Sequence, residues 1–166
     1  MKKYTGGIMK KDSRSVEVAF EAIDKGDYTL ARDLLLSSLA DCNTFNIHYG
    51  LAFCSFQLAI TDTDDEGVNF TLLEEAVKHA EEAAGFQENH FDVQFILGQS
   101  YALYFAATKD PDYQRKARDI YILTRSLASQ RPDLPLESVI DALLSELDTL
   151  VSELGGESDG IGPIYH

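Results

Sequence analysis

The sequence lacks the features of a membrane-spanning, secreted or disulfide-stabilised protein. No apolar run approaches the roughly 20 residues that cross a bilayer, and no apolar signal segment follows the basic start MKKYTGGIMKKD. Only two cysteines occur, Cys42 and Cys54, and no CxxC pair is present. A disulfide framework and a cysteine-based zinc site are therefore not expected. We expect a cytoplasmic protein with no membrane span.

Motifs that carry catalysis or bind nucleotides are also missing. The sequence has no HExxH, no GxSxG, no phosphate-binding loop and no dinucleotide fingerprint. His48 lies beside the apolar residues Ile47 and Tyr49, and the sequence shows no partner that would orient it as an acid or a base. A place in the core or in a binding groove is the favoured interpretation of His48. We predict a protein that is not an enzyme, with no catalytic residue and no cofactor.

Basic residues are scarce compared with acidic ones. The chain has 14 Lys and Arg against 28 Asp and Glu, which gives a formal net charge of −14. Phosphate backbones repel such a surface, so nucleic acid is not expected as a partner. From Asp133 to the end there are eight acids and no Lys or Arg, whereas residues 109–131 hold a concentration of basic side chains. Solubility and charge pairing within the chain are the favoured explanation.

Two groups of residues have part of a metal-binding pattern. The segment 62–67 places acids at the first, third and fifth positions of an EF-hand-like loop, but Leu73 stands where the twelfth position requires a bidentate Glu. Glu75, His79 and Glu82 share one helix face, with no Cys or second His to complete a coordination sphere. We predict no metal site, although a loose cation site in the acidic segment stays open.

The apolar residues follow a helical period throughout, and strand patterns are absent. Gly26 and Asp27 break the chain between two helices, and Asp110 precedes a proline that can begin another. Asn43 is expected to cap a helix, and residues 71–74 have the Thr-x-x-Glu pattern of a capping box. The periodicity predicts helices at 14–25, 28–41, 44–60, 70–85, 90–108, 111–129 and 135–154.

Small and aromatic residues recur at matching places when these helices are paired into hairpins. The first hairpin has Val18-Ala19, Ala22, Ala31 and Leu35; the second has Tyr49-Gly50, Phe53, Ala76 and Ala80; the third has Leu97-Gly98, Tyr101, Ala117 and Tyr121. This pattern resembles the tetratricopeptide-repeat family, although the repeat of that family is 34 residues and here Ala31, Ala76 and Ala117 lie 45 and 41 residues apart.

The resemblance implies an all-α fold of antiparallel helical hairpins in a short right-handed solenoid. We expect one domain over 1–166, with three hairpins in 14–131 and flexible ends at 1–12 and 155–166. An irregular bundle of the same helices stays open as an alternative.

The last predicted helix carries a heptad-spaced apolar seam. Its members are Leu136, Ile140, Leu143, Leu147, Leu150 and Leu154. The favoured interpretation is a capping helix that packs on the third hairpin, because the basic residues of 109–131 complement its acids. A seam for a second copy or for another protein is the alternative.

In the family that the sequence resembles, the first helix of each hairpin lines a concave groove. The matching positions include Val16, Phe20, Ile23, Ile47, His48, Leu51, Phe95, Gln99 and Leu103. None of them is Lys or Arg, which disfavours the family's clamp for acidic chaperone tails. We expect a monomer or weak dimer that acts as an interaction module, binding a protein or peptide with apolar anchors and some positive charge. The alternatives are a secretion-type chaperone that holds an apolar client and a non-catalytic accessory subunit of an enzyme complex.

Overall fold

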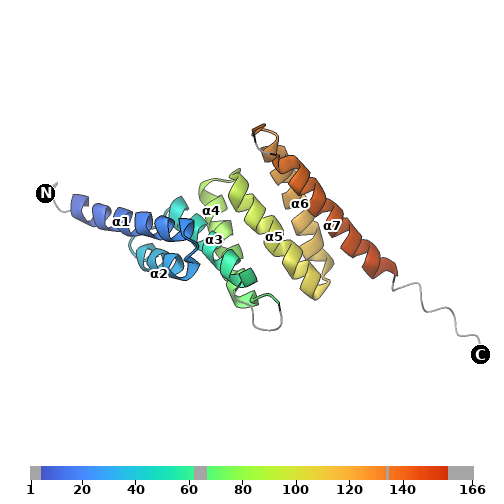
Figure 1. Ribbon diagram of the computed structural model, residues 1–166, viewed down its shortest axis with the longest axis horizontal. Coiled ribbons are helices and arrows are strands. Elements are labelled where there is room, and N and C mark those ends of the chain that lie inside the picture. The colour runs from blue at the N-terminus through green and yellow to red at the C-terminus, as the bar shows by residue number, and fades with distance from the viewer. Residues whose placement is uncertain (1–4, 62–66, 134, 157–166) are drawn as a thin grey trace, which may run out of the picture. The chain divides into compact units, whose positions relative to one another are not determined.

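The protein is helical wherever its structure is described. The computed structural model describes residues 5–61, 67–133 and 135–156, and side chains from residue 14 to residue 155 within those ranges. The helices are α1 (Thr5–Asp24), α2 (Tyr28–Leu39), α3 (Phe45–Thr61), α4 (Phe70–Phe86), α5 (Phe91–Thr108), α6 (Pro111–Ala128) and α7 (Leu136–Gly156) (Figure 1). No strand occurs within these ranges, so the predicted all-α architecture is confirmed.

The observed helix bounds lie close to the predicted ones, with one exception. The first helix begins at Thr5 rather than at residue 14; residues 8–13 contain no glycine or proline to interrupt it, and the helix also continues through Gly6 and Gly7. Part of the segments predicted to be flexible, 5–12 and 155–156, is therefore helical. Residues 1–4 and 157–166, together with most of the acidic segment 62–67, lie outside the described residues.

The chain divides by packing into two compact units, residues 1–100 and residues 101–166. The division falls inside α5. Each unit is described in turn.

The first unit is built from packed helical hairpins. Gly26 adopts a φ of 77° between α1 and α2, and the Asp27 side chain accepts a hydrogen bond from the Leu30 backbone N–H at 3.1 Å, as predicted. α1 contacts α2, α2 contacts α3, and α3 contacts α4. The core between α1, α2 and α3 consists of Ala19, Ala22, Ala31, Leu35, Ile47, Leu51 and Cys54.

α3 approaches α2 closely at Gly50. A Cβ atom added there would lie 2.7 Å from Cδ1 of Leu35 and 3.3 Å from Cζ of Phe20. Leu35 is itself fully buried, so it has little room to retreat. Gly50 is therefore required by packing at this point, since its φ is not in the left-handed region.

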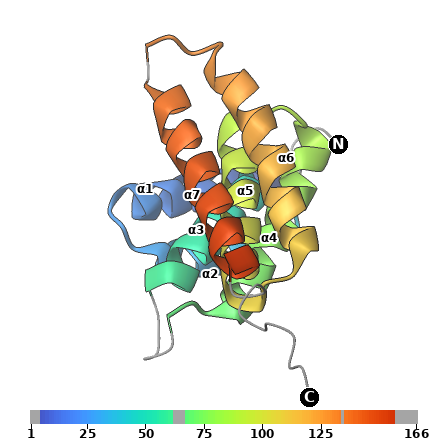
Figure 2. The same cartoon turned by 90° about the vertical axis from the view of Figure 1, so that its right-hand side faces the viewer.

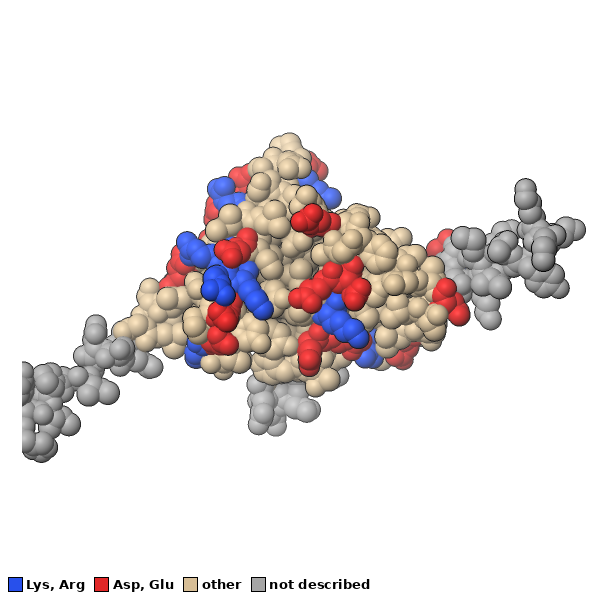
Figure 3. Space-filling view, turned by 180° about the vertical axis from the view of Figure 1, so that it is seen from behind, with Lys and Arg blue, Asp and Glu red and all other residues tan. Residues whose placement is uncertain are grey.

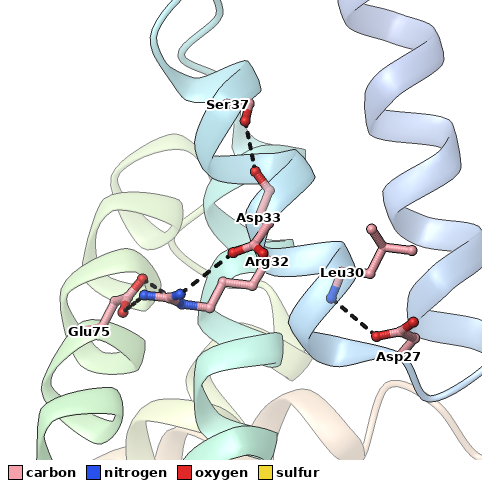
Figure 4. A network of polar contacts seen from close by, with 6 residues as sticks. All are labelled: Asp27, Leu30, Arg32, Asp33, Ser37 and Glu75. Atoms are coloured by element: carbon pink, nitrogen blue, oxygen red, sulfur yellow. Dashed lines mark hydrogen bonds and ion pairs between the residues drawn. The ribbon is translucent and has the colours of Figure 1, made fainter.

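An ion pair ties the first hairpin to the second. Arg32 of α2 donates to Glu75 of α4 through both Nε, at 3.1 Å, and Nη2, at 2.6 Å (Figure 4). Both side chains are partly buried, and the pair raises the pKa of Arg32. A two-point contact between a guanidinium and a carboxylate fixes geometry better than a single bond does, so it sets how α2 lies against α4.

Two predicted helix caps are wrong. α4 begins at Phe70, and the Asn69 side chain accepts from the Leu72 backbone N–H at 3.2 Å. The cap therefore lies before Thr71, because Asn69 is an equally good capping residue. Asn43 does not act as a cap of α3, because its side-chain oxygen is bonded to His48.

In the second unit, the carboxyl-terminal half of α5 meets α6 and α7 lies along α6. The Tyr113 ring lies 6.2 Å from that of Tyr101 and 5.0 Å from that of Tyr104. α6 and α7 run side by side and antiparallel in both ribbon views (Figures 1 and 2). Ile140 and Leu147 of α7 are buried. The predicted packing of the last helix on the third hairpin is confirmed.

Opposite charges meet along the α6–α7 contact, as the sequence predicts. Arg125 Nε donates to Asp141 Oδ1 at 2.6 Å, and Arg118 pairs with Asp148. Basic and acidic side chains lie next to one another on the face shown in Figure 3. These side chains are about half exposed, so each pair contributes little energy, and its main effect is to favour this pairing.

Replacement of Gly50 by valine tests the close approach. The added side chain would press on Leu35 and Phe20, and we expect the free energy of unfolding to fall by about 1–3 kcal/mol. The matched control is Gly85→Val in α4, where an added Cβ meets nothing within 4 Å; it should be neutral or slightly stabilising, since valine is a better helix former than glycine. Urea unfolding followed by circular dichroism measures both. Equal losses would contradict the packing role of Gly50.

Removal of residues 134–166 tests the covering role of α7. The loss of this helix would expose the α6 surface around Tyr121, which is 1% exposed in the intact chain. We expect binding of a hydrophobic dye and aggregation, both measured by fluorescence and light scattering. A shorter truncation that removes only residues 157–166 keeps α7 and should leave both signals low. A monomeric, cooperatively folding 1–133 chain would show that α7 is dispensable.

Candidate functional site

Three of the predicted groove residues lie in the interior. Ile47 and Leu51 are fully buried between α1, α2 and α3, and His48 is only 5% exposed. The sequence pattern matched Tyr49-Gly50 of the second hairpin with Leu97-Gly98 of the third. In the structure, Leu51 and Ala52 are buried in the core and Gly50 packs against Leu35. The predicted face of α3 is therefore wrong: its partly exposed face is the one that carries Phe45, Tyr49 and Phe53.

The remaining predicted groove residues are all half-buried. In the first unit, Val16, Phe20 and Ile23 of α1 pack against the core cluster while keeping part of their surface exposed. Phe95 and Gln99 of α5 have the same intermediate exposure. Leu103 is also half-buried but belongs to the second unit.

A group of partly exposed rings joins three elements of the first unit. We call it the aromatic face; its members are Phe20 of α1, Phe45, Tyr49 and Phe53 of α3, and His90, which precedes α5. The Tyr49 ring is central: its centroid lies 6.5 Å from Phe20, 5.8 Å from Phe45, 6.5 Å from Phe53 and 5.5 Å from His90. Phe45 and His90 are 4.9 Å apart.

The aromatic face is apolar but carries a negative charge beside it. Burial raises the pKa of Tyr49, and the carboxylate of Asp92 raises it further, which places Asp92 near this ring. Phe95, one turn on from Phe91, stacks on it at 5.7 Å and continues the row of rings on α5. Half-exposed rings of this kind offer a large apolar contact area at low cost in side-chain entropy.

Comparison with known proteins supports the fold. No protein-family model matches the sequence, and no curated protein sequence matches it. Among solved structures, the chain is similar to the Yersinia enterocolitica type III secretion translocator chaperone SycD, in an alternative dimer. The TM-score is 0.63, the identity is 14%, and the match covers 84% of this chain and 93% of that chain. At this identity the likeness shows a shared helical fold.

A chain of hydrogen bonds, centred on two buried histidines, bridges α3 and α4. His48 Nδ1 lies 2.9 Å from His79 Nδ1, and His48 Nε2 lies 2.7 Å from Asn43 Oδ1. With the Asn43 oxygen as acceptor, neutral His48 carries its proton on Nε2, and His79 donates from Nδ1 to Nδ1 of His48. Burial lowers the pKa of both histidines, and for His79 the neighbouring His48 lowers it further.

The sequence gives no sign of this bridge. The two histidines are separated by 31 positions, and each was assigned to a different candidate site, His48 to the groove and His79 to a metal-binding trio. In the structure, His79 bonds His48 and Glu75 bonds Arg32. Within the described ranges, no three His, Cys, Asp or Glu side chains come together as a metal site would require.

Other features bear on chemistry only slightly. Burial raises the pKa of the Cys54 thiol to about 12, so this cysteine is protonated and unreactive at neutral pH.

Among the described helices, none combines the length and apolar character needed to cross a bilayer.

The histidine bridge predicts a pH dependence of stability. Because the pKa of both imidazoles is lowered from 6.5 on folding, the unfolded chain binds more protons as the pH falls. Stability is therefore fully present above about pH 6.5 and is lost as the pH falls through the folded pKa values. Urea unfolding between about pH 7.5 and 5 should show this loss.

The variant His48→Gln/His79→Gln should flatten that pH dependence. Acidic residues also titrate in this range, so the informative quantity is the difference in slope from the wild type. An unchanged slope in the double variant would contradict the bridge.

Proposed function

We propose that the protein binds an apolar segment of another protein at the aromatic face, as a chaperone holds a client. The observation that carries this proposal is the cluster around Tyr49, in which rings from α1 and α3, with that of His90 just before α5, stay partly exposed. Aromatic side chains in such a cluster are the residues that most often dominate protein–protein binding energy. A partly exposed cluster of this size is more than scattered surface apolar residues would provide.

The likeness in fold favours a chaperone over a general adaptor. The similar solved structure is a type III secretion translocator chaperone. We therefore place the client-holding role first and the broader interaction module second. The cytoplasmic location stays a prediction.

The client's chemistry follows from the face and its surroundings. Apolar anchors would fill the spaces between the rings, and a Lys or Arg beside an anchor would meet Asp92. The net charge of −14 would also steer a positively charged segment toward the protein.

Binding rather than catalysis is part of the proposal. His48 was the strongest candidate acid or base, and both of its ring nitrogens are engaged, one by His79 and one by Asn43. A general base needs a nitrogen within reach of the substrate proton. This arrangement supports a non-enzymatic role.

A displayed library of random peptides tests the proposal with the full chain as bait. We expect the wild type to enrich peptides with aromatic or aliphatic anchors flanked by Lys or Arg. Phe45→Ala/Phe53→Ala should weaken binding of the enriched peptides at least about tenfold, since hot-spot rings contribute about 2 kcal/mol or more. Fluorescence anisotropy with the selected peptides measures the loss.

The matched control removes two rings elsewhere in the first unit. Phe70 and Phe86 of α4 are 40% and 50% exposed and lie outside the aromatic face. Phe70→Ala/Phe86→Ala should bind the peptides as the wild type does. If both double variants bind equally well while remaining helical, the aromatic face is not the binding surface. If the library yields no apolar peptides at all, the client-holding role is wrong.

A further inference from the structure

On α7 of the second unit, a row of partly exposed residues lies beside the buried face of the helix. Ile140 and Leu147 turn into the unit and are buried, and Asp141 and Asp148 face Arg125 and Arg118 of α6. A different row of α7 residues lies about a quarter turn around the helix from Ile140, on the side opposite Asp141 and Asp148. We call this row the outer stripe; its members are Leu136, Val139, Leu143, Glu146, Leu150 and Glu153.

The outer stripe has the spacing of a helix-binding surface. Leu136, Leu143 and Leu150 recur every seven residues and are half-buried, and Val139 between them is 47% exposed. Two rows with this spacing form the seam by which one helix packs along another. The apolar part of the stripe is therefore shaped for a helix rather than for an extended strand.

Two acids stand inside the stripe. Glu146 and Glu153 follow Val139 at intervals of seven, where a purely apolar seam would continue, and both are exposed. Neither forms an ion pair with a described residue, while the ion pairs of α7 engage Asp141 and Asp148. A helix that docks here must bring positive charge to these two places.

We propose that the outer stripe of α7 binds an amphipathic helix of a partner protein that carries Lys or Arg opposite Glu146 and Glu153. A second copy of α7 fits poorly, because it has no Lys or Arg and would set acid against acid. An anionic lipid surface would be repelled by the same two acids. This proposal goes beyond the aromatic face, which belongs to the first unit, and does not depend on it.

Two synthetic helices about three heptads long test the proposal. The basic probe has leucines on one face and Lys and Arg beside them; the acidic probe has the same leucines with Glu in place of every basic residue. Each is labelled and titrated in fluorescence anisotropy with the full chain carrying Phe45→Ala/Phe53→Ala, so that binding at the aromatic face does not contribute. We expect the basic probe to bind at least about tenfold more tightly than the acidic one.

Charge-reversal variants distinguish binding at the outer stripe from general attraction to the net negative charge of the protein. Glu146→Lys/Glu153→Lys should weaken the basic probe at least about tenfold and strengthen the acidic probe. Glu17→Lys/Glu21→Lys makes the same change in charge at exposed positions of α1 and should leave the ratio of the two affinities unchanged. Val139→Ser, at an exposed position, should weaken both probes.

Several results would overturn the proposal. It fails if the basic probe does not bind, if both probes bind equally, or if the α1 variant loses as much affinity as the α7 variant. A wild-type dimer in sedimentation that dissociates on Val139→Ser would assign the stripe to a second copy. If deletion of residues 157–166 raised probe affinity about tenfold, the outer stripe would instead be the binding surface for the carboxyl-terminal end of this chain, which competes with the probe.

Discussion

The arrangement of the first unit depends on how closely α3 approaches α1 and α2. Gly50 leaves room for Leu35 and Phe20, and the alanines of α1 and α2 let the helices meet around Ile47 and Leu51. Once that face of α3 is buried, its rotation is fixed. The opposite row, Phe45, Tyr49 and Phe53, is then left partly exposed, so the same packing that builds the core also selects the rings that form the aromatic face.

The sequence predicts the helices well because their signals are local. Apolar periodicity and the turns at Gly26 and Asp110 place nearly every helix, and the contrast between basic and acidic segments predicts the α6–α7 pairing. The extension of α1 back to Thr5 was missed, since nothing in the sequence marks where such a helix begins.

The candidate site was predictable only in part. α3 is apolar on nearly all sides, so the spacing of its apolar residues cannot show which side faces the core. The match of Gly50 with Gly98 was a poor guide to which residues of α3 are buried. Asn43 looked like a cap because nothing local reveals that its oxygen is taken by His48. Contacts between side chains far apart in the sequence, such as His48–His79 and Arg32–Glu75, leave no trace in local patterns.

The histidine bridge also limits how α4 can slide along α3. The buried side of α4 includes Ala76, Ala80 and Ala83 beside Leu73, and alanines at successive turns present nearly the same shape, so along this stretch apolar packing resists a shift by one turn only weakly. Such a shift would leave the imidazoles of His48 and His79 buried without each other, at a cost of about 1–3 kcal/mol for each unsatisfied group. The histidine contact thus helps to align α4 within its hairpin, together with the ion pair between Arg32 and Glu75.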